Sequence, residues 1–169
     1  MRTTKVVVGF DPVRLKAPFV LRCGALLIDY IVLIAVPVGT LLFGRWLGYD
    51  GSKLLNSPVA NSGWLVTFLL AVINFLLLPA LNGQSLGKLF TGIKIVGPEG
   101  AVPSLWKLAV RHLIGYPLTL LTGGLGFIWS AFSLGGRALH DYIAGTWVIY
   151  GSKSVTEKRY VRKSGKSAE

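Results

Sequence analysis

The sequence predicts an all-α polytopic membrane protein with two clear transmembrane helices, a third and fourth helix in a hairpin broken by glycine, and a small cytoplasmic pairing of β-strands. Three observations support this fold class. Of 169 residues, 52% are hydrophobic and only 15% are charged, with a mean hydropathy of +0.59, a composition typical of integral membrane proteins. The chain contains two long apolar runs. Its positive charges lie mainly in the ends and connections, where they determine membrane topology.

We divide the chain into three segments. Residues 1–16 carry four basic side chains against one acidic side chain, so the positive-inside rule predicts a cytoplasmic N-terminal segment, with a short strand at Lys5–Gly9. Residues 17–150 form the transmembrane domain. Residues 151–169 carry six basic against two acidic side chains and are rich in Gly, Ser and Lys. We expect this basic cytoplasmic tail to be disordered and to contact anionic lipid headgroups.

The first predicted crossing is the run Ala17–Phe43. From Cys23 to Phe43 there are 21 residues, of which only Asp29 is charged, and about 20 apolar residues of helix are enough to cross a bilayer. An aspartate at mid-helix costs about 2.5 to 3.5 kcal/mol on insertion scales, so contacts elsewhere must offset that cost. Two interpretations stay open. Asp29 is either a polar clasp between helices or an ion or proton site.

Arg22 shares a helix face with Asp29 but lies seven residues earlier, about 10.5 Å along the axis. Helical side chains lean toward the N-terminus, so Arg22 reaches away from Asp29 and a direct ion pair within this helix is not expected. The two side chains either line one water-containing cleft or each find a partner on another helix.

The second predicted crossing is Trp64–Leu81, after a polar loop on the non-cytoplasmic side. Asn74 is its one strongly polar side chain, and a lone asparagine there serves either as interhelical glue or as a neighbour of Asp29 in a site. Pro79 is expected to kink or end the helix.

Residues 82–103 are expected to return to the cytoplasm, with Lys88 among their positive charges. Gly83, Gly87 and Lys88 superficially resemble a phosphate loop. The spacing between the glycines is one residue too short and Leu89 stands where a hydroxyl is required, so we exclude a nucleotide site. Gly87 is expected to serve a turn or close packing.

The stretch Ser104–Gly135 is either one crossing or a hairpin of two arms, Ser104–Thr122 and Leu125–Leu134, broken at Gly123-Gly124. One crossing would place the basic tail outside, against the positive-inside rule, so we prefer the hairpin. Lys107 and Arg111 then mark the cytoplasmic end of its first arm. Beyond the hairpin, the sequence predicts a short strand at Thr146–Tyr150 that pairs with another at Ile93–Val96.

Three pieces of the chain together resemble the RDD family of membrane proteins, which is named for one arginine and two aspartates. They are Arg22 with Asp29, the run NGQSLGKLFTGIKIVGPEG, and the run RALHDYIAGTWVIY, which contains Asp141 as the second aspartate. The resemblance covers about residues 17–150. It implies a small inner-membrane protein of a bacterium or archaeon, and transport is the implied function because some members of the family are described as cation/proton antiporters.

On this basis we expect Asp29 to exchange a proton for Na⁺, Li⁺ or K⁺. Asn74 and backbone carbonyls would complete an oxygen shell suited to a hard cation, with Arg22 as the electrostatic partner of the carboxylate.

A second group of residues is expected at the cytoplasmic side of the membrane domain, near the opening of this ion site. Asp141 is a gate or clasp that pairs with Arg137 or Arg22, and His140 is a candidate proton relay because its ordinary pKa is close to neutral pH.

The competing hypothesis is a non-transporting scaffold or accessory subunit that recruits a partner membrane protein. An enzyme is not expected, because the sequence has no G-x-S-x-G, no paired-carboxylate metal motif and no Cys/His pair at plausible spacing. We expect no cofactor, no zinc-type metal centre and no nucleic acid as ligands. The expected location is the inner (plasma) membrane with both termini in the cytoplasm, as a homo-oligomer or beside a partner protein.

Overall fold

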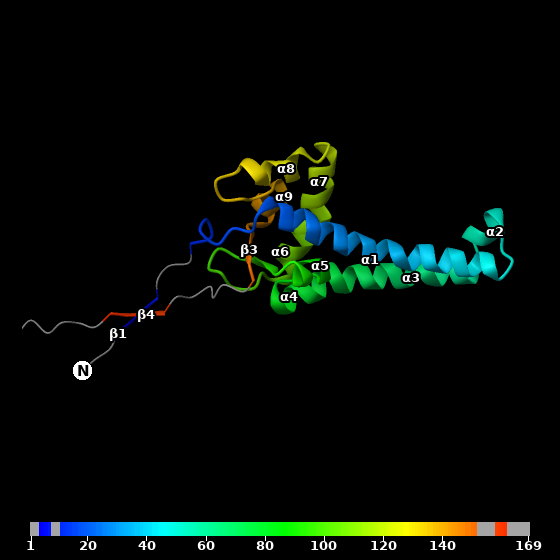
Figure 1. The fold of residues 1–169 in the computed structure, drawn as a ribbon, viewed down its shortest axis with the longest axis horizontal. Helices are drawn as coiled ribbons and strands as arrows, with labels where there is room; N and C mark the ends of the chain where they lie inside the picture. Colours follow the sequence, from blue (N-terminus) through cyan, green and yellow to red (C-terminus); the bar gives the residue numbers. More distant parts are fainter. Residues whose placement is uncertain (1–3, 8–10, 152–157, 162–169) are drawn as a thin grey trace, which may run out of the picture.

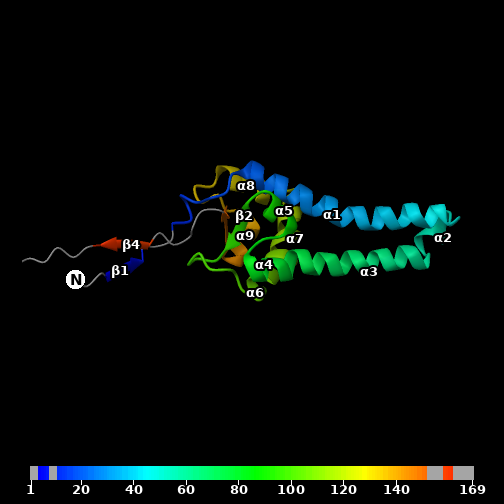
Figure 2. The same ribbon diagram turned by 60° about the horizontal axis from the view of Figure 1, so that its bottom comes forward.

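The computed structural model describes residues 4–7, 11–151 and 158–161. Two long apolar helical rods run side by side, and most of the shorter helices gather with a two-stranded sheet at one end of these rods (Figures 1 and 2). Both rods are long and apolar enough to cross a membrane. The mostly helical fold class with two candidate membrane spans, as expected from the sequence, is confirmed.

The first rod is α1 (Phe19–Trp46), which is about 42 Å long at 1.5 Å per residue. Its buried residues recur mostly every three or four positions and form one stripe that includes Arg22, Ala25, Asp29 and Leu33. Residues on the opposite side, such as Leu27, are exposed and apolar. α1 therefore presents a partly polar face to the rest of the protein and an apolar face outward, the arrangement a membrane helix requires.

The second rod consists of α3 (Pro58–Val72), a π-helical turn η1 (Ile73–Leu77) and α4 (Leu78–Asn82). It starts earlier than the expected Trp64, because the Ser57 side chain caps it by accepting a hydrogen bond from the Ala60 N–H at 3.1 Å. The connection before it also contains α2 (Gly51–Leu55), so the prediction of a plain loop there is wrong.

Pro79 does not end the second rod, which continues to Asn82. A proline in a helix interior lacks an N–H and its ring clashes with the carbonyl four residues earlier. The wider turn η1 lies just before Pro79 and provides the local rearrangement that such a ring needs.

The third helical piece consists of α6 (Leu105–Val110), the π-helical turn η2 (Arg111–Gly115) and α7 (Tyr116–Leu121), followed by α8 (Leu125–Phe132). The axis bends by 95° between Leu121 and Leu125. Gly123 and Gly124 at the bend have φ of +62° and +82°, values that glycine adopts without a steric penalty. The predicted break at these two glycines is confirmed.

The end of the two rods where the short helices and the sheet gather is the crowded end of the protein. Its sheet pairs β2 (Ile93–Val96) with β3 (Trp147–Tyr150) in antiparallel register, as predicted from the sequence. Two further short helices, α5 (Leu86–Phe90) and α9 (Leu139–Ala144), directly precede these strands in the chain. Ile93, Ile95 and Val148 are buried with Leu108 in one apolar cluster. Next to this sheet, α5 packs against α1 and α9 packs against η2.

A second strand pair joins β1 (Thr4–Val7) to β4 (Lys158–Val161). The expected N-terminal strand is therefore present, although its last two expected residues lie outside the described part of the chain. The tail was expected to be disordered, and this is wrong for Lys158–Val161, which form β4. The expectation for residues 152–157 and 162–169 falls outside the described part of the chain.

The two rods pack closely enough that Gly63 has no room for a side chain. A Cβ atom at Gly63 would lie 2.8 Å from the Cβ of Thr40 in α1. We expect Gly63→Ala to lower the thermal unfolding midpoint in detergent, because overpacking costs about 1 to 3 kcal/mol. Gly39→Ala is the matched control, since nothing lies within 4 Å of its Cβ position. Equal midpoints for the two variants would contradict this packing.

Candidate functional site

Two fully buried aspartates organise the crowded end of the protein. Asp29 of α1 is 1% exposed and Asp141 of α9 is 0% exposed. Burying a carboxylate is costly unless hydrogen bonds and opposite charges surround it, so the partners of these two residues define the candidate site.

Asp29 is held by the second rod and by the start of α5. Asn74 in η1 donates from Nδ2 to Asp29 Oδ1 at 2.8 Å, the Gly87 N–H donates to the same oxygen at 2.7 Å, and Ser85 Oγ donates to Oδ2 at 2.6 Å. The Leu86 N–H donates to Asn74 Oδ1 at 2.8 Å, which fixes the orientation of the amide. Asn74 is therefore a direct neighbour of Asp29.

Gly87 allows α5 to reach Asp29. A Cβ at Gly87 would lie 1.9 Å from the Ala25 carbonyl oxygen and 2.9 Å from Asp29 Cγ. Any larger residue would push α5 away from α1 and break the hydrogen bond to the carboxylate. The prediction that Gly87 serves close packing is confirmed.

Lys88 is the nearest positive charge to Asp29. Its Nζ lies 3.9 Å from Asp29 Oδ2 and 3.1 Å from Ser85 Oγ, and the residue is only 6% exposed. Burial, and then the positive charge of Arg111, lower the pKa of Lys88 to about 8, although Asp29 acts in the opposite direction. Lys88 is thus a buried site residue, although the sequence predicted only that it lies in a connection that returns to the cytoplasm.

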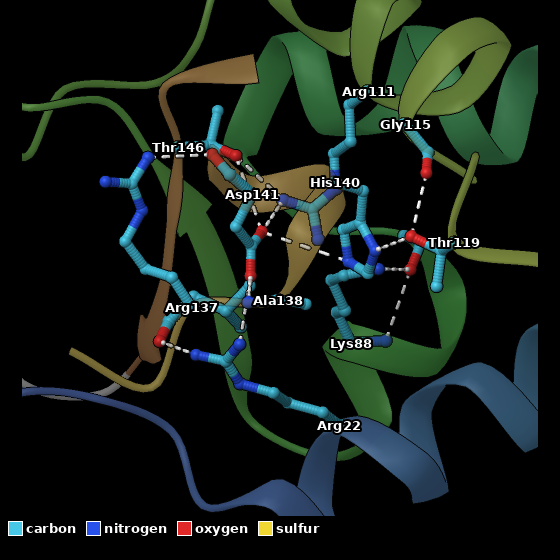
Figure 3. A network of polar contacts seen from close by, with 12 residues as sticks. Arg22, Lys88, Arg111, Gly115, Thr119, Arg137, Ala138, His140, Asp141 and Thr146 are labelled. Atoms are coloured by element: carbon cyan, nitrogen blue, oxygen red, sulfur yellow. Dashed lines mark hydrogen bonds and ion pairs between the residues drawn. The ribbon is translucent and has the colours of Figure 1, made fainter. Parts of the chain in front are cut away.

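Asp141 is held between two arginines (Figure 3). Arg22 Nη1 lies 3.0 Å from Asp141 Oδ2, and Arg111 donates to Oδ1. The Ala138 N–H donates to Oδ2 at 3.0 Å. Burial raises the pKa of the Asp141 carboxyl, but the two arginines, His140 and the backbone N–H outweigh that effect, so its pKa lies well below the ordinary value. Asp141 stays ionised at any physiological pH.

The two arginines also bind β3 and the residue directly before it. Arg22 Nη2 donates to the Val148 carbonyl at 2.9 Å, and Arg111 Nη1 donates to Thr146 Oγ1 at 2.8 Å. A single carboxylate therefore joins α1, η2, α9 and β3. From the sequence, Arg111 was expected only to mark the cytoplasmic end of the first arm, whereas the structure buries it, at 2% exposed, against Asp141.

Arg22 and Asp29 do not pair with each other, as the helix geometry predicted, and each finds its partner on another element. Of the two pairings considered for Asp141, the one with Arg22 is present. The predicted ion pair between Arg137 and the Asp141 carboxylate is wrong, because Arg137 Nη2 instead donates to the backbone carbonyl of Asp141 at 2.9 Å. Its guanidinium lies 4.2 Å from the Tyr142 ring and 4.1 Å from the Trp147 ring, which hold it away from the carboxylate.

His140 lies in a row of stacked rings. It stacks on Tyr116 with a centroid distance of 4.5 Å, and its Nδ1 is 3.4 Å from Thr119 Oγ1. Burial, followed by the charge of Arg111, lowers the pKa of His140 to about 3. The ring is therefore neutral at pH 7, and the proton relay considered for it stays a prediction.

A cavity of about 230 Å³ lies beside Asp29 and beside the two arginines that bind Asp141. Its charged lining is formed by Arg22, Asp29, Lys88 and Arg111. With Asp141 behind the arginines, the cluster contains three basic and two acidic side chains. It carries one surplus positive charge whenever Lys88 is protonated.

The sequence model of the RDD family matches residues 16–145 of this chain. The chain belongs to the RDD family. It is similar to a protein of Bacillus subtilis (strain 168) named Uncharacterized protein YckC, with 32% identity over 155 residues that cover 88% of this chain and 95% of the relative. No solved structure matches it. Family membership and the two apolar rods identify a membrane protein. In this RDD protein, Arg22 pairs with the second aspartate, Asp141, and the first aspartate, Asp29, has Lys88 as its basic neighbour.

Sequence reasoning missed Lys88, Ser85 and Arg111. A signal for Lys88 and Ser85 was available, because a capping serine followed three residues later by a lysine stands two residues after the glycine that ends the second rod. Arg111 had no comparable signal, since its spacing from Lys107 is equally typical of a solvated helix face.

We expect Asp141→Asn to destabilise the protein by about 3 to 5 kcal/mol, because it leaves two buried arginines without their counter-charge. Asp50→Asn is the matched control. It breaks the exposed pair between Arg45 and Asp50, which are 2.7 Å apart, and such surface pairs contribute at most about 1 kcal/mol. Denaturant unfolding in detergent measures both changes. Comparable losses would show that Asp141 is not the central contact.

Proposed function

We propose that the protein exchanges a monovalent cation for a proton across the membrane, with Asp29 as the cation ligand and Lys88 as the proton carrier. The observation that carries this proposal is the buried Asp29–Lys88 pair, which lines the cavity and has an Nζ–Oδ2 distance of 3.9 Å. A lysine whose pKa is about 8 releases its proton near physiological pH, whereas an ordinary lysine does not.

The ammonium of Lys88 and a metal cation compete for the same oxygens. When Lys88 loses its proton, Asp29 Oδ2 and Ser85 Oγ lose the positive charge beside them and become available to Na⁺, Li⁺ or K⁺, which prefer oxygen ligands. One proton leaves Lys88 for water and one cation enters, so the charge of the cluster does not change. This balance favours a one-for-one exchange.

Asn74 and Gly87 have a positioning role in this scheme. They donate to Asp29 Oδ1 at 2.8 and 2.7 Å and keep the carboxylate oriented, so that Oδ2 remains directed toward Ser85 and Lys88. Arg22 and Asp141 form a permanent ion pair and act as the clasp that holds the cavity wall, in place of a gate that opens by titration.

We propose that the two rods cross the plasma membrane. The end of the protein that carries the sheet then lies in the cytoplasm. The basic residues of the N-terminal segment and of the chain beyond position 151 favour this orientation under the positive-inside rule. The connection that contains α2 then lies on the opposite side.

The first test is cation-driven proton movement in liposomes that contain the purified protein, compared with Asp29→Asn. Asparagine keeps the size of the side chain and an oxygen for Asn74 and Gly87, but it cannot carry a charge. We expect Na⁺, Li⁺ or K⁺ to drive proton flux in the unchanged protein and at least about a tenfold lower flux in the variant. A thermal unfolding curve establishes that the variant is folded.

Two outcomes would reject the exchange proposal. Flux that is unchanged in Asp29→Asn would remove Asp29 from the mechanism and leave it as an interhelical clasp. No flux with any of the three cations in the unchanged protein would reject transport of these ions and favour the scaffold hypothesis.

The pH dependence of the exchange tests Lys88 separately. Below its pKa of about 8 the lysine is charged and excludes the cation, so the exchange rate should rise as pH increases through 8. Lys88→Arg should abolish this rise, because a guanidinium keeps its proton at these pH values. Lys53→Arg, at an exposed lysine of α2, is the control. A rise of the same size in Lys88→Arg would assign the titration to another group.

A further inference from the structure

A second hollow, of about 510 Å³, adjoins the cavity beside Asp29 and differs from it in chemistry. Its additional lining comes from α7 and the bend that follows it, and consists of Pro117, Thr119, Leu120 and Gly124. The two hollows share one wall, formed by Leu26, Tyr30, His112, Tyr116, Phe127 and His140. The cavity beside Asp29 is therefore a cationic chamber, and the second hollow is an apolar groove. They lie against each other between α1 and the bent helix pair.

The groove lies on the lipid-facing side of the protein. Leu120 in its lining is 78% exposed and Leu118 and Leu121 on the same helix are 41% and 82% exposed. In a membrane such residues contact hydrocarbon, so the natural occupant of the groove is an apolar chain.

The chamber beside the groove has unused capacity for an anion. Arg22, Lys88 and Arg111 exceed Asp29 and Asp141 by one positive charge when Lys88 is protonated. In addition, Nε of Arg22 and Nε of Arg111 are buried and have no hydrogen-bond partner among the described residues, although the two side chains are 5% and 2% exposed. Buried donors of this kind are normally satisfied, so two unsatisfied arginine donors in a chamber wall point to a missing acceptor.

We propose that the joined hollows bind an anionic phospholipid, with its phosphate beside Arg22, Arg111 and Lys88 and one acyl chain in the groove along α7. Phosphate oxygens match the geometry of guanidinium donors and supply the missing negative charge. A zwitterionic lipid offers the same chain without the net charge, and a soluble phosphate offers the charge without the chain. Neither satisfies both hollows.

This site is separate from the contact expected between the basic tail and lipid headgroups. The tail attracts the membrane surface through exposed charges, whose effect is screened by salt. The chamber holds its charges at low exposure, so we expect its preference for an anionic lipid to persist at high salt. The proposal does not rest on cation exchange, because it requires only the charges and the groove.

The experiment measures lipid binding to the full-length protein in a neutral detergent at high salt, by native mass spectrometry. The probes are phosphatidylglycerol, phosphatidylcholine with the same acyl chains, and glycerol phosphate, which has the headgroup alone. We expect phosphatidylglycerol to bind at least about tenfold more tightly than either of the others. Equal binding of the two lipids would overturn the proposal. Glycerol phosphate binding as tightly as phosphatidylglycerol would assign the chamber to a soluble anion and also overturn it.

A pair of neighbouring variants tests the groove. Leu120→Trp fills it, whereas Leu121→Trp places the same ring on the next residue, which is equally exposed and lines neither hollow. We expect Leu120→Trp to weaken phosphatidylglycerol binding about tenfold and Leu121→Trp to leave it unchanged. Equal effects of the two variants would reject the groove as the acyl-chain site.

A second pair tests the chamber. Lys88→Gln should reduce the preference for phosphatidylglycerol over phosphatidylcholine, and Lys53→Gln in α2 should not. A preference that survives Lys88→Gln in full would belong to other charges and contradict the proposal. Because no cation gradient is present in the binding assay, failure of lipid binding and failure of exchange are distinguished by separate measurements.

Discussion

The ion pairs of Asp141 determine how the crowded end of the protein is assembled. One buried carboxylate pairs with Arg22 from α1 and with Arg111 from η2. Arg22 also binds the backbone of β3, and Arg111 binds Thr146 directly before that strand. Each of these groups would be costly to bury alone, because a charge removed from water needs a counter-charge and hydrogen bonds. The cluster therefore forms only when all four elements are in place, which makes their arrangement cooperative.

The Asp29 cluster is built differently. Three neutral donors surround Asp29, and its one basic neighbour, Lys88, is 3.9 Å away with a pKa lowered to about 8. A carboxylate supported mainly by neutral groups tolerates the loss of its cation better than one that is the shared counter-charge of two buried arginines. This difference is the physical basis for assigning exchange to Asp29 and a permanent structural role to Asp141.

Both clusters depend on a π-helical turn that precedes a proline. η1 ends two residues before Pro79 and carries Asn74, and η2 ends two residues before Pro117 and carries Arg111. The wider turn changes which residues of the helix face inward, and such turns occur frequently at functional sites. A helical periodicity of 3.6 residues does not describe these positions, which is one reason why the sequence did not indicate that Arg111 contacts Asp141.

The sequence by itself determined the features that depend on composition and local geometry. The two apolar runs predicted the rods, and Gly123-Gly124 predicted the break. The runs near Ile93 and Val148, which are rich in β-branched residues, predicted the sheet. It also indicated that Arg22 and Asp29 are too far apart on one helix to pair. Only the tertiary structure decided the partners. Lys88 and Arg111 are separated from Asp29 and Asp141 by 59 and 30 residues, and a lone basic residue has the same local pattern whether it meets water or a buried carboxylate. Its environment is fixed by the packing of distant elements, which no local pattern contains.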